Sequence, residues 1–179
     1  MTASNGRTGW IARTGQPERD ALFETLDSAE CGGLPWHWEQ WARPEQLPPP
    51  GGWRTWLLCA GRGFGKTRAG AEWVRRIARE CPEARIALVA ASLAEARAVM
   101  IEGESGLLAC CPPGTRPLFE PSLRRLTWSN GAQAFLYSAA EPESLRGPQH
   151  SHAWCDEIGK WEMPPAPRLP RSAWPTANR

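Results

Sequence analysis

The first half of the chain combines short apolar runs with one amphipathic segment. Residues 56–60 and 85–91 are apolar runs of strand length, and we expect both to form buried strands. Residues 67–79 repeat apolar side chains at helical spacing. Cys81-Pro82 ends this segment, because the residue before a proline avoids helical geometry. The pattern therefore predicts strand, helix and strand in that order.

The next segment begins with a helix-start signal. Ser92 can cap a helix that runs to about residue 100, and Glu95 at the third helical position completes a capping box. Residues 102–121 are rich in glycine and proline, so we expect a long loop there.

A hairpin is the clearest local signal in the second half. Residues 125–129 and 132–137 flank Asn130-Gly131, a pair that tolerates the positive φ that a type I′ turn requires at both central positions. Residues 152–155 are expected to form a further strand. Strands and helices in this order predict an α/β fold.

The N-terminal third is less regular. Residues 1–17 are rich in small polar residues and are expected to be disordered. Residues 19–26 have a short helical pattern. The prolines and glycines at 48–52 stop any regular element and mark a boundary.

Composition and charge limit the classes of binding partner that we expect. The 179 residues are 41% hydrophobic and 22% charged, as in ordinary globular domains. A net charge of +2 is too small to indicate a nucleic-acid partner by itself. Residues 51–100, however, carry nine Lys/Arg against four Glu. No apolar run approaches the ~18–20 residues of a membrane span, so no membrane partner is expected.

The cysteines and histidines do not predict a metal centre. The six cysteines form no C-x-x-C pair, so zinc-ribbon spacing is absent, and reduced thiols in a cytosol are expected. His150, His152 and Cys155 lie close together, but no second cluster completes a set of four ligands.

Residues 60–67 carry the strongest chemical signal. They lie between a predicted strand and a predicted helix, which is the context of an ATP phosphate-binding loop. Glycines let backbone N–H groups turn toward phosphate oxygens, and the helix N-terminus adds positive charge. Lys66 can reach the β and γ phosphates, and Thr67 offers a hydroxyl to Mg²⁺. The predicted ATP-binding residues are Ala60 (in place of the usual glycine), Gly61, Arg62, Gly63, Phe64, Gly65, Lys66 and Thr67.

An acidic pair follows the last predicted strand. Asp156 can hold Mg²⁺ and its water shell, and Glu157 can orient and deprotonate the attacking water. Acidic pairs are common on surface turns, so the prediction of a catalytic role for this pair depends on the phosphate-binding loop predicted at 60–67.

Several motifs in one order resemble the large terminase subunit, the ATPase-nuclease that packages DNA into phage heads. The branch most similar to this chain occurs in prophages and gene transfer agents. The resemblance covers about residues 34–161 and rests on segments 41–46, 53–56, 61–63, 66–75, 102–107, 126–131, 142–149 and 153–157.

This resemblance implies an ATP-driven DNA translocase with an ASCE-type P-loop sheet, mainly parallel and incomplete at the C-terminus. ATP and Mg²⁺ would be its cofactors. Its partners would be double-stranded DNA, the portal protein and the small terminase subunit, with the subunits forming a homo-oligomeric ring. The implied location is the bacterial cytoplasm and, transiently, the procapsid portal.

The resemblance also implies roles for single residues. Gln46 would lie near the adenine. The implied catalytic residues are Lys66, Arg62, Glu157 and Arg146. Four arginines are candidates for sensing phosphate or acting across a subunit interface, and the sequence does not choose among them: Arg146, Arg97, Arg124 and Arg125.

Residues 162–179 depart from the resemblance. Five prolines fall between positions 164 and 175, a density that excludes a helix or a central strand. We therefore expect a flexible or partly helical segment at 1–33, a partial ATPase domain at 34–161 and an aberrant tail at 162–179. The expected product is truncated, has no nuclease and hydrolyses ATP weakly.

Two other functions stay open. A catalytically inactive nucleotide-binding remnant or interaction fragment would bind ATP without DNA-stimulated hydrolysis. A helicase-type ATPase would also have a glutamine before the loop and an Asp-Glu pair, but its downstream motifs are missing.

Overall fold

The computed structural model describes residues 15–25 and 32–161. The expectations for residues 1–14 and for the tail at 162–179 lie outside this part of the chain. Helix α2 (Gln16–Thr25) overlaps the short helix expected at 19–26. Three short elements follow it: η1 (Leu34–Trp36), α4 (Trp38–Trp41) and η2 (Pro44–Gln46).

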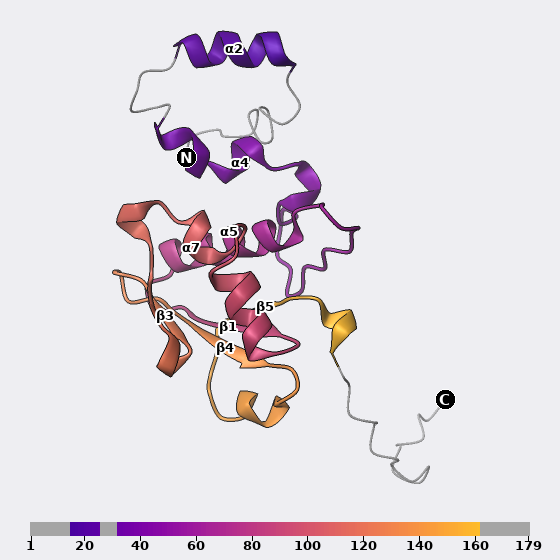
Figure 1. Ribbon diagram of the computed structural model, residues 1–179, viewed down its shortest axis with the longest axis vertical. Coiled ribbons are helices and arrows are strands. Elements are labelled where there is room, and N and C mark those ends of the chain that lie inside the picture. The colour runs from indigo at the N-terminus through magenta and orange to yellow at the C-terminus, as the bar shows by residue number, and fades with distance from the viewer. Residues whose placement is uncertain (1–14, 26–31, 162–179) are drawn as a thin grey trace.

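A five-stranded mixed sheet lies at the centre of the fold, in the order β2-β3-β4-β1-β5 (Figure 1). Strands β4, β1 and β5 are parallel, whereas β2 and β3 add to β4 in antiparallel fashion. The bounds are β1 (Arg85–Ala90), β2 (Leu118–Glu120), β3 (Arg125–Thr127), β4 (Gln133–Ser138) and β5 (His152–Cys155). The predicted α/β class with a parallel centre is confirmed.

Helical segments cover one face of this sheet. They are α5 (Lys66–Glu80), α6 (Leu93–Glu95) with the π-helix η3 (Ala96–Ile101) that continues it, and α7 (Leu107–Cys110). The helix expected at 67–79 and the strand expected at 85–91 are therefore confirmed. The helix after Ser92 also forms, and the Ser92 hydroxyl accepts the Glu95 N–H as predicted, at 3.2 Å. The capping box is not completed, because the Glu95 carboxylate lies 3.8 Å from the Lys160 ammonium group instead of bonding to the Ser92 N–H. Its second half widens into a π-helix.

The apolar core lies between these helices and the sheet. Leu88 of β1 is fully buried and pairs with Leu136 of β4, so the two side chains point to the same face. Val74, Met100 and Leu107, one from each covering helix, close over this face and are also fully buried. Each such side chain stabilises the fold by roughly 1.5–3 kcal/mol.

A close contact between α5 and β5 fixes the distance between helix and sheet. Gly70 of α5 lies directly against the indole of Trp154, so a Cβ atom at position 70 would overlap the ring. Trp154 is buried, and it pairs with Leu88 of β1 although β5 lies at the end of the sheet. Only glycine therefore fits where the helix crosses the strand.

The strand expected at 56–60 does not form, so this prediction is wrong. Leu57 is 74% exposed, and residues 56–60 make no hydrogen bond from backbone to backbone within the part of the chain that the structure describes. Strand β5 ends the sheet and pairs on one side only, with β1, yet residues 56–60 do not pair with its outer edge. An apolar run indicates strand propensity, but a strand also needs a free neighbouring edge at hydrogen-bonding distance.

Two local predictions also need correction. The hairpin of β3 and β4 forms, but its turn is not type I′, because only Gly131 has positive φ, at 104°. The Asn130 side chain instead donates to the Ala78 carbonyl oxygen at 2.7 Å, which ties the turn to α5. The expected loop at 102–121 contains α7, β2 and a 3-10 turn, η4 (Pro113–Thr115). Further 3-10 turns are η5 (Pro121–Leu123), η6 (Pro142–Leu145) and η7 (Ile158–Lys160).

We expect Gly70→Ala to destabilise the fold by about 1–3 kcal/mol, because the added methyl group must displace the buried Trp154 ring. Urea unfolding followed by tryptophan fluorescence measures the change. Gly114→Ala is the matched control, since a Cβ there meets nothing within 4 Å, and it should shift stability by less than about 0.5 kcal/mol. Equal unfolding midpoints for the two variants would contradict the packing argument.

Candidate functional site

The glycine-rich loop at residues 60–67 runs directly into α5. Gly63 and Gly65 have φ of 73° and 84°, in the left-handed region that favours glycine. Helix α5 begins at Lys66, immediately after Gly65. The backbone N–H groups of residues 62–65 donate no hydrogen bond to any described residue. The loop therefore presents unpaired donors next to a helix N-terminus, which suits an anion.

The Lys66 side chain folds back over this loop. Its ammonium group donates to the carbonyl oxygens of Ala60 and Gly61, at 2.8 and 2.9 Å. Both acceptors are neutral, and no acidic partner of Lys66 lies within salt-bridge distance in the described residues. Its charge is therefore not neutralised by a direct carboxylate contact.

A segment upstream of the loop, at residues 43–46, forms hydrogen bonds with it. The Gln46 amide donates to the Phe64 carbonyl oxygen at 2.8 Å, and the Arg43 guanidinium donates to the same oxygen at 2.5 Å. Arg43 also lies 4.6 Å from the centre of the Phe64 ring, a cation–π contact. A Cβ at Gly65 would stand 2.6 Å from the Gln46 amide nitrogen, so the approach is close. We call Arg43 and Gln46 the loop clamp.

The two acidic residues lie at the carboxyl end of β5. The Asp156 N–H donates to the Val89 carbonyl oxygen at 2.9 Å, which continues the pairing with β1. Burial raises the pKa of Asp156 above its ordinary value, and the neighbouring Glu157 charge adds to the rise. Glu157 has left-handed backbone geometry, with φ 45°. A hydrogen bond from Lys160 lowers the pKa of Glu157.

An open cavity of about 500 Å³ brings these elements together. Residues 62–68 line one wall, and Asp156 and Glu157 line another. A third wall comes from the π-helix and the turn after it, at Ala98, Val99 and residues 103–105. The volume is in the range of small-molecule sites. The structure therefore unites the loop and the acidic pair that the sequence singled out separately.

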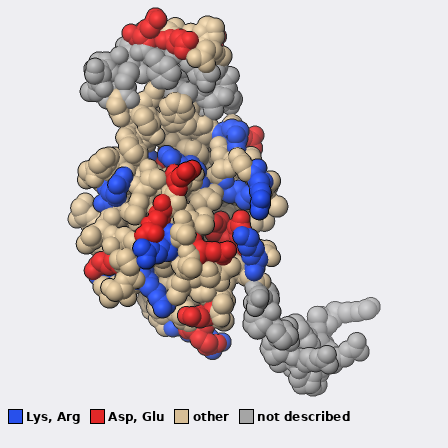
Figure 2. Space-filling model, in the orientation of Figure 1, with Lys and Arg blue, Asp and Glu red and all other residues tan. Residues whose placement is uncertain are grey.

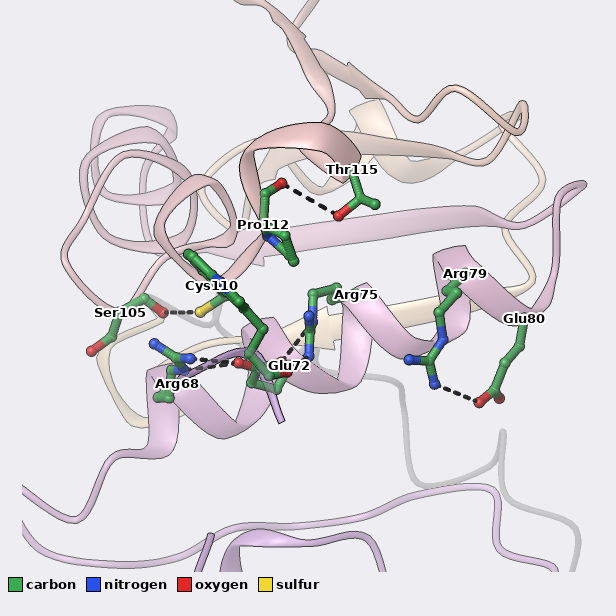
Figure 3. A network of polar contacts seen from close by, with 10 residues as sticks. Arg68, Glu72, Arg75, Arg79, Glu80, Ser105, Cys110, Pro112 and Thr115 are labelled. Atoms are coloured by element: carbon green, nitrogen blue, oxygen red, sulfur yellow. Dashed lines mark hydrogen bonds and ion pairs between the residues drawn. The ribbon is translucent and has the colours of Figure 1, made fainter. Parts of the chain in front are cut away.

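A buried ion-pair network lies on α5 just beyond the loop (Figure 3). Glu72 is 3% exposed, and its two oxygens contact Arg68 at 2.6 Å and Arg75 at 2.7 Å. Burial raises the pKa of Glu72, although both arginines oppose the rise. Arg75 also donates to the Trp36 carbonyl oxygen at 2.8 Å. The network ties the helix to the upstream segment that carries the loop clamp.

The structure brings together most of the predicted site residues, but not all. Arg62 and Thr67 line the cavity, whereas Gln46 lies behind the loop and lines a smaller cavity beside α5. The four candidate arginines do not line the large cavity. They are on the surface in ion pairs, Arg146 with Glu143, Arg97 with Glu102, Arg124 with Glu141 and Arg125 with Glu120.

Some residues of the site had no clear sequence signal. Arg43 precedes Gln46 by three positions, but nothing in its spacing indicates a contact with Phe64. The turn at 103–105 belonged to a segment expected to be an unstructured loop. Lys160 could have been singled out from the sequence, because the chain has two lysines and the other one, Lys66, belongs to the glycine-rich loop.

The histidines and surface charges do not indicate a second site. Among the described residues no group of three or more His, Cys, Asp or Glu side chains is placed to hold a metal. His150 instead contacts the Tyr137 hydroxyl at 3.0 Å, and His152 packs edge-on against Trp73. On the face seen in Figure 2, acidic and basic side chains are interspersed over the described residues.

No described helix combines the length and the apolar character needed to cross a bilayer.

Comparison with known proteins gives a family match. The family model described as "Terminase large subunit, T4likevirus-type, N-terminal" matches residues 57–164, whereas no curated protein and no solved structure matches the chain. The match includes the whole glycine-rich loop, the acidic pair and all five strands. Because it covers more than half of the chain, the protein belongs to the family of terminase large subunits and carries its T4likevirus-type N-terminal region.

Proposed function

We propose that this chain binds ATP with Mg²⁺ in the large cavity and hydrolyses it as the motor region of a DNA-packaging terminase. The observation that carries the proposal is the single cavity that the glycine-rich loop, Lys66 and the Asp156–Glu157 pair line together. Membership of the terminase family connects this cavity with DNA packaging.

The loop side of the cavity suits the phosphates. The unpaired N–H groups of residues 62–65 and the start of α5 offer donors and positive charge. Lys66 would exchange its two carbonyl contacts for the β and γ phosphates, since a neutral carbonyl competes weakly with a phosphate anion. Arg62 adds a second cation at the same wall.

The acidic side suits the metal and the water. Thr67 and Asp156 would hold the metal ion, which supplies charge neutralisation between the β and γ phosphates. Asp156 fits this role, because a carboxylate whose pKa is raised by burial is stabilised by a cation. Glu157 would orient the attacking water and accept its proton.

The loop clamp gives Gln46 a role in this scheme. By holding the Phe64 carbonyl, Arg43 and Gln46 keep the loop open toward the cavity. An adenine contact of Gln46 stays a prediction.

The remaining expectations are also proposals. They are an ASCE-type P-loop fold, domain limits at 34 and 161, and a ring that acts on double-stranded DNA with portal protein and small terminase subunit.

An inactive nucleotide-binding remnant is the main competing function. Such a remnant would bind ATP at residues 62–68 in the same way, but Asp156 and Glu157 would not support hydrolysis. ATP binding without phosphate release by the wild-type chain would favour this alternative. The family match favours a terminase over a helicase-type ATPase.

We expect Lys66→Ala to weaken ATP binding about 10- to 100-fold, because charged hydrogen bonds to the phosphates are lost. Isothermal titration calorimetry with a non-hydrolysable ATP analogue and Mg²⁺ measures the affinity. Arg79→Ala removes a positive charge from the exposed far end of the same helix and serves as the control, with an affinity within about twofold of wild type. If both variants bind like wild type, the loop is not the nucleotide site.

We expect Asp156→Asn to stabilise the chain at pH 7 while it removes Mg²⁺-dependent hydrolysis. The pKa of Asp156 is raised in the folded state, so stability falls as the pH rises above the ordinary pKa of an aspartate, and the loss is complete once the pH exceeds the raised pKa. The stabilisation should shrink as the pH falls, because Asp156 is then protonated in the folded chain. Thermal unfolding between pH 4 and 8 without metal tests the sign.

Phosphate release with Mg²⁺ should fall roughly 100-fold or more in the same variant. Glu83→Gln, which neutralises an exposed carboxylate in the turn before β1, is the control and should change neither property. A Tm at pH 7 that is lower in Asp156→Asn than in wild type would show that the carboxylate is structural.

A further inference from the structure

Gln46 is buried on the side of the glycine-rich loop that faces away from the large cavity. The residue is 6% exposed and lines the smaller cavity beside α5, which has a volume of about 60 Å³. Phe64 and Gly65 line the large cavity and also lie against the Gln46 amide, so the loop stands between that amide and the large cavity. The smaller cavity is far below the roughly 300–1,000 Å³ of small-molecule sites.

Both ends of the Gln46 amide have a partner within the chain. Its carbonyl oxygen accepts the Arg43 backbone N–H at 2.9 Å, and its NH₂ group donates to the Phe64 carbonyl oxygen at 2.8 Å. The first partner can only donate and the second can only accept, so the chemistry of the partners fixes the orientation of the amide. A base contact would have to open this buried arrangement, and a buried polar group that loses its partner costs free energy.

A short turn holds the amide in this position. Gln46 ends η2, and its backbone N–H donates to the Arg43 carbonyl oxygen at 2.9 Å. Two hydrogen bonds therefore join residues 43 and 46, one from each backbone N–H. Pro44 opens the turn with a fixed φ, which favours this geometry before any ligand binds. The amide is thus preorganised toward the Phe64 carbonyl.

The large cavity offers ligands for phosphate but no side-chain amide for a base. Arg62, Lys66 and Thr67 line it together with the unpaired N–H groups of the loop. No Asn or Gln side chain lines this cavity among the described residues, and an amide is the group that pairs with both hydrogen-bonding groups on one edge of adenine. Without such a contact, selectivity falls well below the roughly 10⁴- to 10⁵-fold that hydrogen bonding to a substrate group can reach.

We propose that Gln46 is a positioning residue that fixes the Phe64 carbonyl, and that the site recognises the triphosphate group without selecting adenine. The inference rests on the nucleotide binding proposed above, and it gives Gln46 a different role from the adenine contact that the family resemblance implies. The substrate class is a purine nucleoside triphosphate with either base, and inorganic tripolyphosphate binds at the same loop.

Binding to the wild-type chain tests the substrate class. Isothermal titration calorimetry compares non-hydrolysable analogues of ATP and GTP with inorganic tripolyphosphate, each in the presence of Mg²⁺. We expect the GTP analogue to bind within about tenfold of the ATP analogue, and tripolyphosphate to compete with both. A larger preference for the ATP analogue, or tripolyphosphate that does not compete, would overturn the inference.

Gln46→Met tests the positioning role, because methionine has a similar length but cannot donate to Phe64. We expect this variant to bind all three ligands more weakly by the same factor, about three- to tenfold. Gln40→Met is the matched control and should bind all three within about twofold of wild type, since Gln40 lies on α4 and lines neither cavity. A loss confined to the ATP analogue would show that Gln46 reads adenine, contrary to the proposal.

A spectroscopic measurement separates positioning from a general loss of stability. Carbonyl ¹³C labelling of the four phenylalanines gives one NMR signal for each. The Phe64 signal should shift in Gln46→Met, because its oxygen loses a donor, whereas the other three should not, and Gln40→Met should leave all four in place. Shifts of all four signals in Gln46→Met, or of none, would contradict a role confined to the loop.

The outcomes distinguish the two proposals. If neither the ATP analogue nor tripolyphosphate binds to the wild-type chain, the proposed function fails and this inference fails with it. If both bind but Gln46→Met binds them like wild type, the positioning role alone is overturned.

Discussion

The contact between Gly70 and Trp154 is the constraint on which the site depends. Helix α5 carries the glycine-rich loop at its N-terminus, and β5 carries the acidic pair at its carboxyl end. Because the helix crosses the strand without an intervening side chain, these two ends lie on one cavity. A larger residue at position 70 would separate the cations of the loop from the carboxylates that face them.

The loop is supported from two sides. The loop clamp, Arg43 and Gln46, holds the Phe64 carbonyl from upstream, and the Arg68–Glu72–Arg75 network fixes the first turns of α5. Glu72 is buried and ionic, so removal of either arginine would leave a partly uncompensated charge in the interior. These contacts hold the glycine-rich loop in place at the start of α5, and a preorganised loop suits anion binding.

Electrostatics divides the acidic pair into two chemical roles. Burial raises the pKa of Asp156, and Lys160 lowers the pKa of Glu157. A partly buried carboxylate favours a metal ion as partner, whereas the exposed Glu157 is held in its ionised form by the ion pair with Lys160. Adjacent positions in the sequence thus acquire different properties because Asp156 is partly buried, whereas Glu157 is exposed and paired with Lys160.

The sequence by itself singled out the glycine-rich loop and the acidic pair, and it predicted α5 and strands β1, β4 and β5. These features follow from local residue order, glycine conformation and apolar periodicity. It failed for residues 56–60, because a strand forms only where the tertiary structure brings it within hydrogen-bonding distance of a sheet edge, and for Asn130, which bonds to a distant helix. Tertiary structure alone decided the loop clamp, the third cavity wall and the sharing of Lys160 by Glu157 and Glu95, since those contacts join residues that no local spacing relates.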